Sequence, residues 1–260
     1  MSELSRREWL ALAGGGVAAA LGPGAVAQAP AAEEGDMILI PAGPCLIGTT
    51  DDRAAYLAQA HGYHVSWLSG EYPQRRVEVP AFLIDRYPVT NRRFLEFARA
   101  TGHAPRVYWR GGEPPEGLLN HPVTCVNRAD ALAYCAWAGL RLPSEVEWEK
   151  AARGEDGRAF PWGQEFDPEA CRWNPEKLAS RPGTAPVDAH PRGASPYGVL
   201  DLIGNVAEWC ADPPPPHGAL RGGCWLTSEV LNLRAAARHM NGFDNNAANF
   251  YGFRCARDVV

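Results

Sequence analysis

Residues 183–209, GTAPVDAHPRGASPYGVLDLIGNVAEW, decide how the rest of this chain is interpreted. Glycine and proline recur through the stretch, and the apolar runs at 199–203 and 206–210 are too short to be helices. Short apolar runs bounded by turn residues predict strands. Similar runs follow at 220–225 and 253–256. We therefore expect the chain after residue 160 to consist of short strands joined by irregular loops.

The preceding part of the chain carries clear helix signals instead. Thr90, Asn127 and Ser144 are good N-cap residues, and each precedes a helical pattern that ends at a glycine. The patterns predict helices over 91–100, over 128–138 and from residue 144 to 153. Residues 37–40 and 82–85 predict buried strands. Because no linker separates helices from strands, the sequence predicts one α+β domain with short helices, short antiparallel strands and much irregular structure.

Two helix faces are assigned from the spacing of their residues. Leu132, Cys135 and Ala138 fall on one stripe, so we expect them to point into the core. Glu147, three residues after Ser144, completes a capping box. The neighbouring Glu145 and Glu149 are expected on a solvated face.

Composition excludes several classes of protein. The 260 residues carry a net charge of -5, which is too weak to direct the protein to nucleic acid or anionic lipid. The chain has 27 glycines, 23 prolines and nine tryptophans, which is typical of a loop-rich globular protein with a substantial core. Its sequence indicates no oligomeric state.

The first residues predict an export signal. Arg6 and Arg7 precede an apolar run that reaches about Leu21, and small residues at 25–27 form a cleavage site. This pattern predicts a twin-arginine-type signal over 1–27, followed by a linker over 28–36. The alternative is an uncleaved membrane anchor, although the run is short for a span. We expect an exported, periplasmic or otherwise extracytoplasmic protein, with no membrane span once the signal is removed.

All seven cysteines follow this signal. In an oxidising compartment disulfides are expected, and an odd number leaves at least one thiol free or paired outside the chain. No pair has the C-x-x-C spacing of a zinc ribbon or a redox helix.

Several stretches resemble one protein family. They are MILIPAG, FLIDRYPVTNRRFLEF, RLPSEVEWEKAARG, PWG, residues 183–209, LRGGCW and YGFRCA, in this order. They are similar to the formylglycine-generating enzymes, also called sulfatase-modifying factors. The likeness covers about residues 37–256. It implies a single C-type-lectin-like domain, which we place at 37–260.

The resemblance also defines a departure from the family. In the enzymes, two cysteines shortly after an RGGS turn bind copper and oxidise a substrate cysteine with oxygen. Here Cys224 stands where the family has serine, and residues 226–229 stand where the first catalytic cysteine and its neighbours would be. No cysteine lies between Trp225 and Arg238. The standard formylglycine-generating activity is therefore predicted to be absent.

Cys210 and Cys224 remain candidates for other chemistry. If the strands that carry them pair, the two thiols are neighbours, and three alternatives stay open: a disulfide, two inert buried thiols, or a relocated metal site for copper or iron. The family resemblance implies a separate structural bridge between Cys135 and Cys255.

Calcium is the metal that the resemblance favours. The family holds calcium at the GNVAEW motif, which here offers the Asn205 amide, the Val206 carbonyl and the Glu208 carboxylate, all hard oxygen donors. The alternative is that Asn205 caps a turn and Glu208 pairs with an arginine such as Arg234 or Arg238. A second family site would use Asn174, with Glu176 replacing an acidic stretch that is missing.

An iron site at two histidines is the weaker metal hypothesis. His61 and His64 invite comparison with sulfoxide synthases of this superfamily, which use a histidine triad. No third histidine is identifiable here, so we expect surface or hydrogen-bonded histidines.

A ligand pocket is predicted around the family's active-site position. Aromatic and amide side chains there suit stacking and hydrogen bonding to a ligand. The predicted lining is Trp209, Cys224, Trp225, Arg238, Asn245 and Asn249.

Two classes of function follow from these residues. The first is a ligand-binding or protein-maturation accessory domain that takes a small molecule or an exported protein or peptide. The second is a divergent metal- or thiol-dependent oxidoreductase that matures an exported peptide, sulfatase or siderophore. A diversified ligand-binding receptor is a further alternative.

Overall fold

The computed structural model describes residues 37–104, 109, 112–176, 183–212, 218–240 and 246–259. The predicted export signal and linker lie outside the described residues, as does Asn245.

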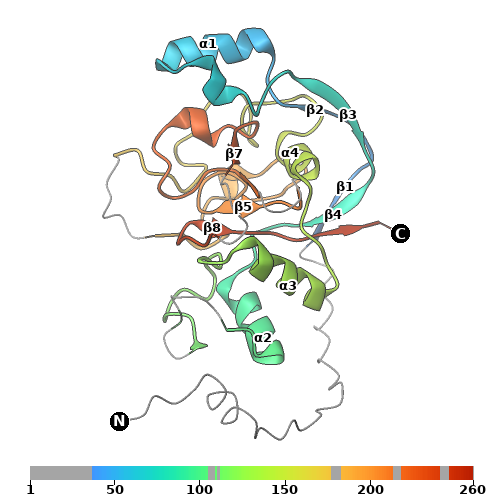
Figure 1. Cartoon of the computed structure of the whole chain (residues 1–260), viewed down its shortest axis with the longest axis vertical. Helices are drawn as coiled ribbons and strands as arrows, with labels where there is room; N and C mark the ends of the chain where they lie inside the picture. Colours follow the sequence, from blue (N-terminus) through green and yellow to red (C-terminus); the bar gives the residue numbers. More distant parts are fainter. Residues whose placement is uncertain are drawn as a thin grey trace, which may run out of the picture.

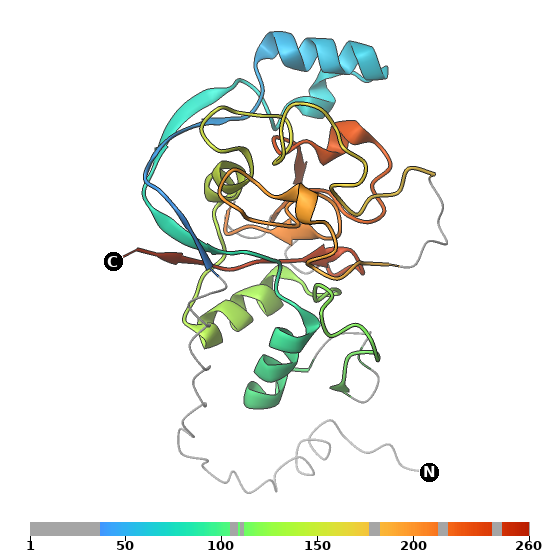
Figure 2. The same cartoon turned by 180° about the vertical axis from the view of Figure 1, so that it is seen from behind.

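Nine short strands form three sheets in the described part of the chain (Figures 1 and 2). The first sheet has the order β1-β4-β9 and is antiparallel, with β1 at Met37–Ile40, β4 at Phe82–Asp85 and β9 at Ala256–Asp258. The second is an antiparallel ribbon of β2 (Gly43–Ile47) and β3 (Arg75–Val79).

The third sheet lies in the middle of the molecule (Figure 1). Its order is β7-β6-β5-β8, and β8 runs parallel to β5 while the other pairs are antiparallel. Its strands are β5 at Ala207–Trp209, β6 at Ala219–Arg221, β7 at Arg238–Met240 and β8 at Tyr251–Gly252.

Four α-helices and three 3-10 turns complete the described elements. The α-helices are α1 at Asp51–His61, α2 at Asn91–Thr101, α3 at Arg128–Ala138 and α4 at Glu145–Arg153. The 3-10 turns are η2 at Val65–Leu68, η4 at Pro191–Gly193 and η5 at Val230–Leu233. None of the helices in the described residues is long and apolar enough to cross a bilayer.

The predicted helices and the α+β class are confirmed. Thr90, Asn127 and Ser144 accept the expected N-cap hydrogen bonds, and the last two form capping boxes. Helix α1 is not predicted by the sequence analysis, although Thr50 caps it and Gly62 ends it in the left-handed conformation.

Four details of the sequence prediction are wrong. The predicted strand at 220–225 ends at Arg221, the last residue of β6, because a Gly-Gly turn follows. Residues 199–203 are not a strand but an irregular segment, and its side chains Val199, Leu202 and Ile203 are buried in the core that contains Trp148. Of the predicted strand at 253–256, only Ala256 belongs to a strand, β9, and residues 253–255 lie between β8 and β9. Leu132 is 43% exposed, while Cys135 on the same helix is 2% exposed, so only part of the predicted stripe faces the core.

Strands β5 and β6 separate two hydrophobic cores. Trp209 and Leu220 belong to the core that contains the aromatic side chains of α2 and α3. Cys210 belongs to the core that contains Trp148 of α4 and the side chains of β1, β2 and β4. Since side chains alternate between the two faces of an extended chain, Trp209 at the end of β5 and Cys210 directly after it enter different cores. Figures 1 and 2 show α2 and α3 on one side of this sheet and α1 with the β2–β3 ribbon on the other.

Candidate functional site

A pocket of about 540 Å³ opens beside Trp225 and is called the Trp225 pocket below. Its volume is in the range of small-molecule sites. It is lined by Asn91, Trp109, Pro115, Leu118, His121, Pro122, Thr124, Gly183, Thr184, Trp225 and Asn249. These residues come from five segments that are distant in sequence, so the complete fold is needed to assemble the pocket.

The two glycines before Cys224 explain how Trp225 reaches this wall. Gly222 and Gly223 have φ values of 92° and 69°, which favour glycine. A Cβ on Gly222 would lie 2.3 Å from the carbonyl oxygen of Leu202. The chain therefore turns tightly there, and the Trp225 amide donates to the Asn205 carbonyl at 3.0 Å. The indole Nε1 donates to the Asn249 carbonyl at 3.1 Å, which fixes the ring.

His121 and Thr184 supply the polar groups of the pocket. The His121 Nδ1 and the Thr184 Oγ1 are 3.0 Å apart. Burial lowers the pKa of His121 below its ordinary value of 6.5, so the imidazole is mainly neutral at pH 7. Asn91 donates from Nδ2 to the carbonyls of Leu118 and His121 and holds their loop in place. A neutral imidazole both donates and accepts, which suits an uncharged polar group.

Cys224 lies beside the pocket but does not line it. Its side chain is 8% exposed, its amide donates to the Thr227 Oγ1 at 3.0 Å, and its Sγ is 3.6 Å from the same oxygen. Burial raises the pKa of the thiol above its ordinary value. Because the thiolate is the nucleophile and the metal ligand, a raised pKa makes Cys224 a poor candidate for either role.

The expectation that Cys210 and Cys224 are neighbours is wrong. In the β5–β6 ladder Glu208 pairs with Arg221, and the Cys210 amide donates to the Ala219 carbonyl. Cys224 is at the opposite end of the ladder, and the two thiols belong to different cores. Burial also raises the pKa of Cys210 well above its ordinary value. The structure therefore does not assemble the relocated dithiol site.

The other predicted pocket residues separate into different places. Trp209 is completely buried and donates from Nε1 to the Val126 carbonyl at 3.0 Å, so it is a core residue and not part of the pocket. Arg238 lines a second pocket, described below. Trp225 and Asn249 both line the Trp225 pocket, and their role in ligand binding stays a prediction.

Cys135 and Cys255 are brought together. Both are buried, and their sulfur atoms are 3.5 Å apart as free thiols. The covalent bridge stays a prediction.

The calcium motif is held by protein contacts. The Oε1 and Oε2 of Glu208 each accept from Arg254 at 2.7 Å, and Oε2 also accepts from the Trp148 Nε1 at 2.8 Å. The arginine partner is therefore Arg254, not the Arg234 or Arg238 that the sequence suggested. This pairing already neutralises Glu208, so its carboxylate does not fit a calcium ion in this arrangement.

The amide that was predicted to bind the same ion is also occupied. The Asn205 Oδ1 accepts from the Ala185 amide at 2.9 Å, and its Nδ2 donates to the Asp201 Oδ2 at 2.7 Å. Asp201 is the remaining carboxylate at the motif, and burial raises its pKa to about 8. Val206 and Asn174 are buried nearby: the Asn174 amide donates to the Thr227 carbonyl, and the Asn205 amide to the Arg172 carbonyl.

Transition-metal ligands are not clustered in the part of the chain that the structure describes, where no group of three histidine, cysteine or acidic side chains is suited to a metal ion. His64 caps η2 and shares a 2.8 Å hydrogen bond with Ser66, while the His61 ring stacks parallel to Tyr63.

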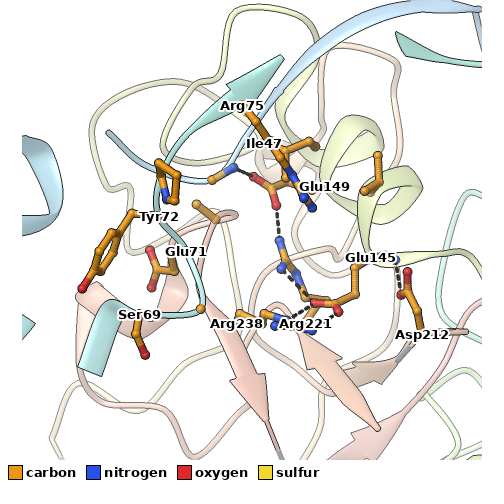
Figure 3. Close-up of a pocket in the computed structure, with 15 residues that line it drawn as sticks. Ile47, Ser69, Glu71, Tyr72, Arg75, Glu145, Glu149, Asp212, Arg221 and Arg238 are labelled. Atoms are coloured by element: carbon orange, nitrogen blue, oxygen red, sulfur yellow. Dashed lines mark hydrogen bonds and ion pairs between the residues drawn. The ribbon is translucent and has the colours of Figure 1, made fainter. Parts of the chain in front are cut away.

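A second pocket, of about 530 Å³, lies on the far side of the β5–β6 sheet and is called the arginine pocket (Figure 3). The predicted solvated face of α4 lines it. Glu149 is 2% exposed and pairs with Arg153 and Arg221, each at 2.5 Å. Glu145 accepts from the Nε and Nη2 of Arg238, both at 2.5 Å. The prediction of solvent exposure is therefore wrong for Glu149, because Arg221 of β6 and Arg153 of its own helix neutralise it.

Several residues of the Trp225 pocket carry no sequence signal for a ligand site. Asn91 and Thr184 lie inside stretches that were recognised as motifs, but their local signals indicated only a helix start and a loop. His121 and Trp109 lie in segments without a motif. Only the complete fold shows that these residues meet.

The fold and the site together define a class of protein: an α+β domain with a ligand-sized pocket beside a Gly-Gly turn. The family model described as the sulfatase-modifying factor enzyme 1-like domain matches residues 23–259. The chain belongs to this family, the FGE-sulfatase family.

Known relatives agree with this assignment. The formylglycine-generating enzyme of Thermomonospora curvata is 36% identical, over 74% of this chain and 86% of the relative. The "Inactive C-alpha-formylglycine-generating enzyme 2" of Mus musculus is 32% identical, over 86% of both chains. Among solved structures, PvdO from Pseudomonas aeruginosa superposes with a TM-score of 0.69 at 25% identity, over 86% of this chain and 94% of that one.

Proposed function

We propose that this protein is an exported member of the family that binds a ligand in the Trp225 pocket and does not carry out copper-dependent oxidation. It would act as a ligand-binding or protein-maturation accessory domain. One observation carries the proposal: the RGG turn places an aromatic side chain in the pocket wall and buries its cysteine beside it. The position retains the shape of a binding site, but its thiol has a raised pKa.

The lining of the Trp225 pocket supports a small molecule or an exported peptide as ligand. Trp109 and Trp225 offer apolar ring surface, and Thr184 and the neutral His121 place polar groups in the same wall. This combination of aromatic surface and a few polar groups is typical of ligand sites. The mouse relative, which is described as inactive, supports the view that members of this family persist without the oxidase activity.

A divergent oxidoreductase would need thiolates or metal ligands that meet at one place. Cys210 and Cys224 are separated by the β5–β6 register, and both thiols have raised pKa values. The dithiol form of that alternative therefore loses its structural basis.

The absence of oxidase activity is tested by incubating the full mature chain with copper, oxygen and a Cys-x-Pro-x-Arg peptide, and by measuring aldehyde by mass spectrometry. We expect no aldehyde, whereas the Thermomonospora curvata enzyme in parallel provides the positive control. Aldehyde formed by the wild type and lost in Cys224→Ser would overturn the proposal.

Ligand binding is tested separately, with a thermal-shift screen of small molecules and peptides. The comparison is between the wild type and Thr184→Trp, which fills the pocket from a half-buried position. Compounds that raise the Tm of the wild type alone would support the Trp225 pocket. A screen without such compounds would count against it.

Export and calcium belong to the same proposal. Replacing Arg6 and Arg7 by lysine is expected to retain the precursor inside the cell, because the twin-arginine route requires the pair. For calcium, a cation beside the motif would favour the ionised form of the buried Asp201 carboxyl, whose pKa burial raises to about 8.

A further inference from the structure

The arginine pocket is separate from the site proposed above. Its walls come from the end of β2, the loop after η2, the start of α4, and strands β6 and β7 (Figure 3). It shares no lining residue with the Trp225 pocket. Its volume of about 530 Å³ is in the range of sites for small organic molecules.

The carboxylates of this pocket already have partners within the protein. Glu149 accepts from the Gly48 amide at 2.7 Å in addition to its two arginines. Glu71 pairs with Arg234 at 2.8 Å. Asp212 accepts from the amide of Glu145 at the first turn of α4. Glu71 and Glu149 are therefore compensated by arginines, whereas Asp212 is held by a neutral amide.

The arginines, in contrast, retain unused donors. Arg221 is 3% exposed, and its Nη1 and Nη2 are paired, but its Nε is buried without a hydrogen-bond partner in the described structure. Glu145 holds the Nε and Nη2 of Arg238, and among the described residues the Nη1 has no hydrogen bond. A buried N–H group without an acceptor is costly, so the Arg221 Nε indicates a missing acceptor.

Arg75 adds an uncompensated charge to the same wall. It is exposed at the first position of β3, and no ion pair joins it to the described residues. Figure 3 shows Arg75 above Arg221 and Arg238 on the side of the pocket that carries Glu149. The pocket therefore combines satisfied carboxylates with guanidinium donors that lack acceptors, and its complement is an anion.

We propose that the arginine pocket binds a small molecule that carries an oxyanion, either a carboxylate or a phosphate. The anion accepts from the guanidinium groups of Arg75 and Arg238, and Arg221, whose Nε–H lacks an acceptor, lines the same pocket. Charge-assisted bonds from arginine to an oxyanion are stronger than those between neutral groups, and they select for charge. The protein therefore has a second ligand site of opposite character to the Trp225 pocket.

Calorimetry on the full mature chain at low ionic strength tests this site with three probes. Succinate carries two carboxylates, succinamide has nearly the same shape without charge, and inorganic phosphate offers the alternative oxyanion. We expect succinate or phosphate to bind and succinamide not to bind, with an affinity that falls as NaCl is added. Whichever anion binds more tightly assigns the carboxylate or the phosphate class.

Two neighbouring arginines provide a matched pair of variants. Arg75 and Arg76 are both exposed on β3, but only Arg75 lines the pocket. We expect Arg75→Gln to weaken anion binding about fivefold, the scale of one exposed charge, and Arg76→Gln to leave it unchanged. Because both side chains are exposed, both variants are expected to fold.

A direct readout of the orphaned donor completes the test. The Nε–H resonance of Arg221, assigned by its loss in Arg221→Lys, is expected to shift when the anion is added to the wild type. The inference is overturned if neither anion binds at millimolar concentration or if succinamide binds as well as succinate. It is equally overturned if Arg75→Gln binds like Arg76→Gln.

Discussion

The Trp225 pocket and the arginine pocket are similar in volume, but the first is lined mainly by neutral side chains and the second largely by charged ones. Tryptophan rings and neutral hydrogen-bonding groups line the first, and its nearby core contains α2 and α3. Carboxylates and guanidinium groups line the second, which borders α4. The two faces of β5 and β6 divide them: Trp209 and Leu220 lie on one face, Glu208 and Arg221 on the other.

This difference separates groups that hold the fold from groups that are available to a ligand. We call the side of the β5–β6 sheet that carries the arginine pocket the arginine half, and the opposite side the Trp225 half. In the arginine half, Glu149 and Arg221 are almost completely buried, and each depends on the other's charge. In the Trp225 half, His121 and Thr184 are only partly buried, and aromatic packing holds the elements beneath them. Removing a polar group should therefore have different consequences in the two halves.

The largest expected effect concerns the sulfur pair of the Trp225 half. If Cys135 and Cys255 form the bridge that the family implies, it closes a loop between positions 120 residues apart. The chain-entropy model then predicts a contribution of about 4–5 kcal/mol to the free energy of unfolding. Denaturant unfolding of the oxidised protein with and without dithiothreitol measures it.

A matched variant separates this bridge from the other thiols. The double variant Cys135→Ala/Cys255→Ala should show no response to dithiothreitol. If peptide mapping of the exported protein finds both thiols free, the aromatic core holds this half without a covalent link.

The second effect concerns the arginine half. Glu149→Gln leaves Arg153 and Arg221 buried without their shared carboxylate, and breaking a buried ion pair costs about 3–5 kcal/mol. Thr184→Val in the Trp225 pocket should change the free energy of unfolding by less than about 1 kcal/mol. Urea unfolding of both variants measures the contrast directly.

Glu96→Gln is the control for removing a charge, because Glu96 is exposed on α2. Equal stabilities of Glu149→Gln and Glu96→Gln would show that the ion network does not hold the arginine half.

The third effect is a pH dependence that belongs to the Trp225 pocket. Burial lowers the pKa of His121, so the unfolded chain binds a proton more readily than the folded protein does. Stability is fully present above pH 6.5 and falls as the pH drops from 6.5 towards the lower folded pKa. His121→Gln should lack this component, which is visible as a flatter profile of Tm against pH between 7 and 5. If the Tm of His121→Gln falls with pH as steeply as that of the wild type, groups other than His121 cause the pH dependence.

These contrasts also explain which features the sequence could predict. Helices α2, α3 and α4 are marked by their own caps, Thr90, Asn127 and Ser144, whose hydrogen bonds stay within a few residues. Strands β7 and β8 have only three and two residues, and only pairing across the fold defines them.

The candidate sites depend even more on contacts between distant residues. Glu149 was expected in solvent because its spacing on α4 gives no sign of Arg221, 72 positions away. The sequence predicts Trp209 in the pocket because it is next to other motif residues along the chain. The motif does not show on which face of β5 each side chain lies. Trp225 and Asn249 do line one cavity, since the family resemblance carries information about the fold that their local sequence lacks, and their role in ligand binding stays a prediction.

The smallest expected effect tests the calcium proposal and the turn that supports Trp225. The Trp225 amide donates to the Asn205 carbonyl, and the Asn205 side chain donates to Asp201, so a cation at Asp201 would stabilise this side of the pocket. Calcium should then raise the Tm by about 3 °C relative to EDTA, and magnesium should not.

Because burial raises the pKa of Asp201 to about 8, its carboxyl is mainly protonated at pH 7 without a cation. Asp201→Asn is a neutral replacement of similar shape, so it should retain the Tm measured in EDTA and lose the response to calcium. If the wild type retains no calcium and its Tm is the same in EDTA, the motif is held by the Glu208–Arg254 pair and the Asn205 hydrogen bonds alone.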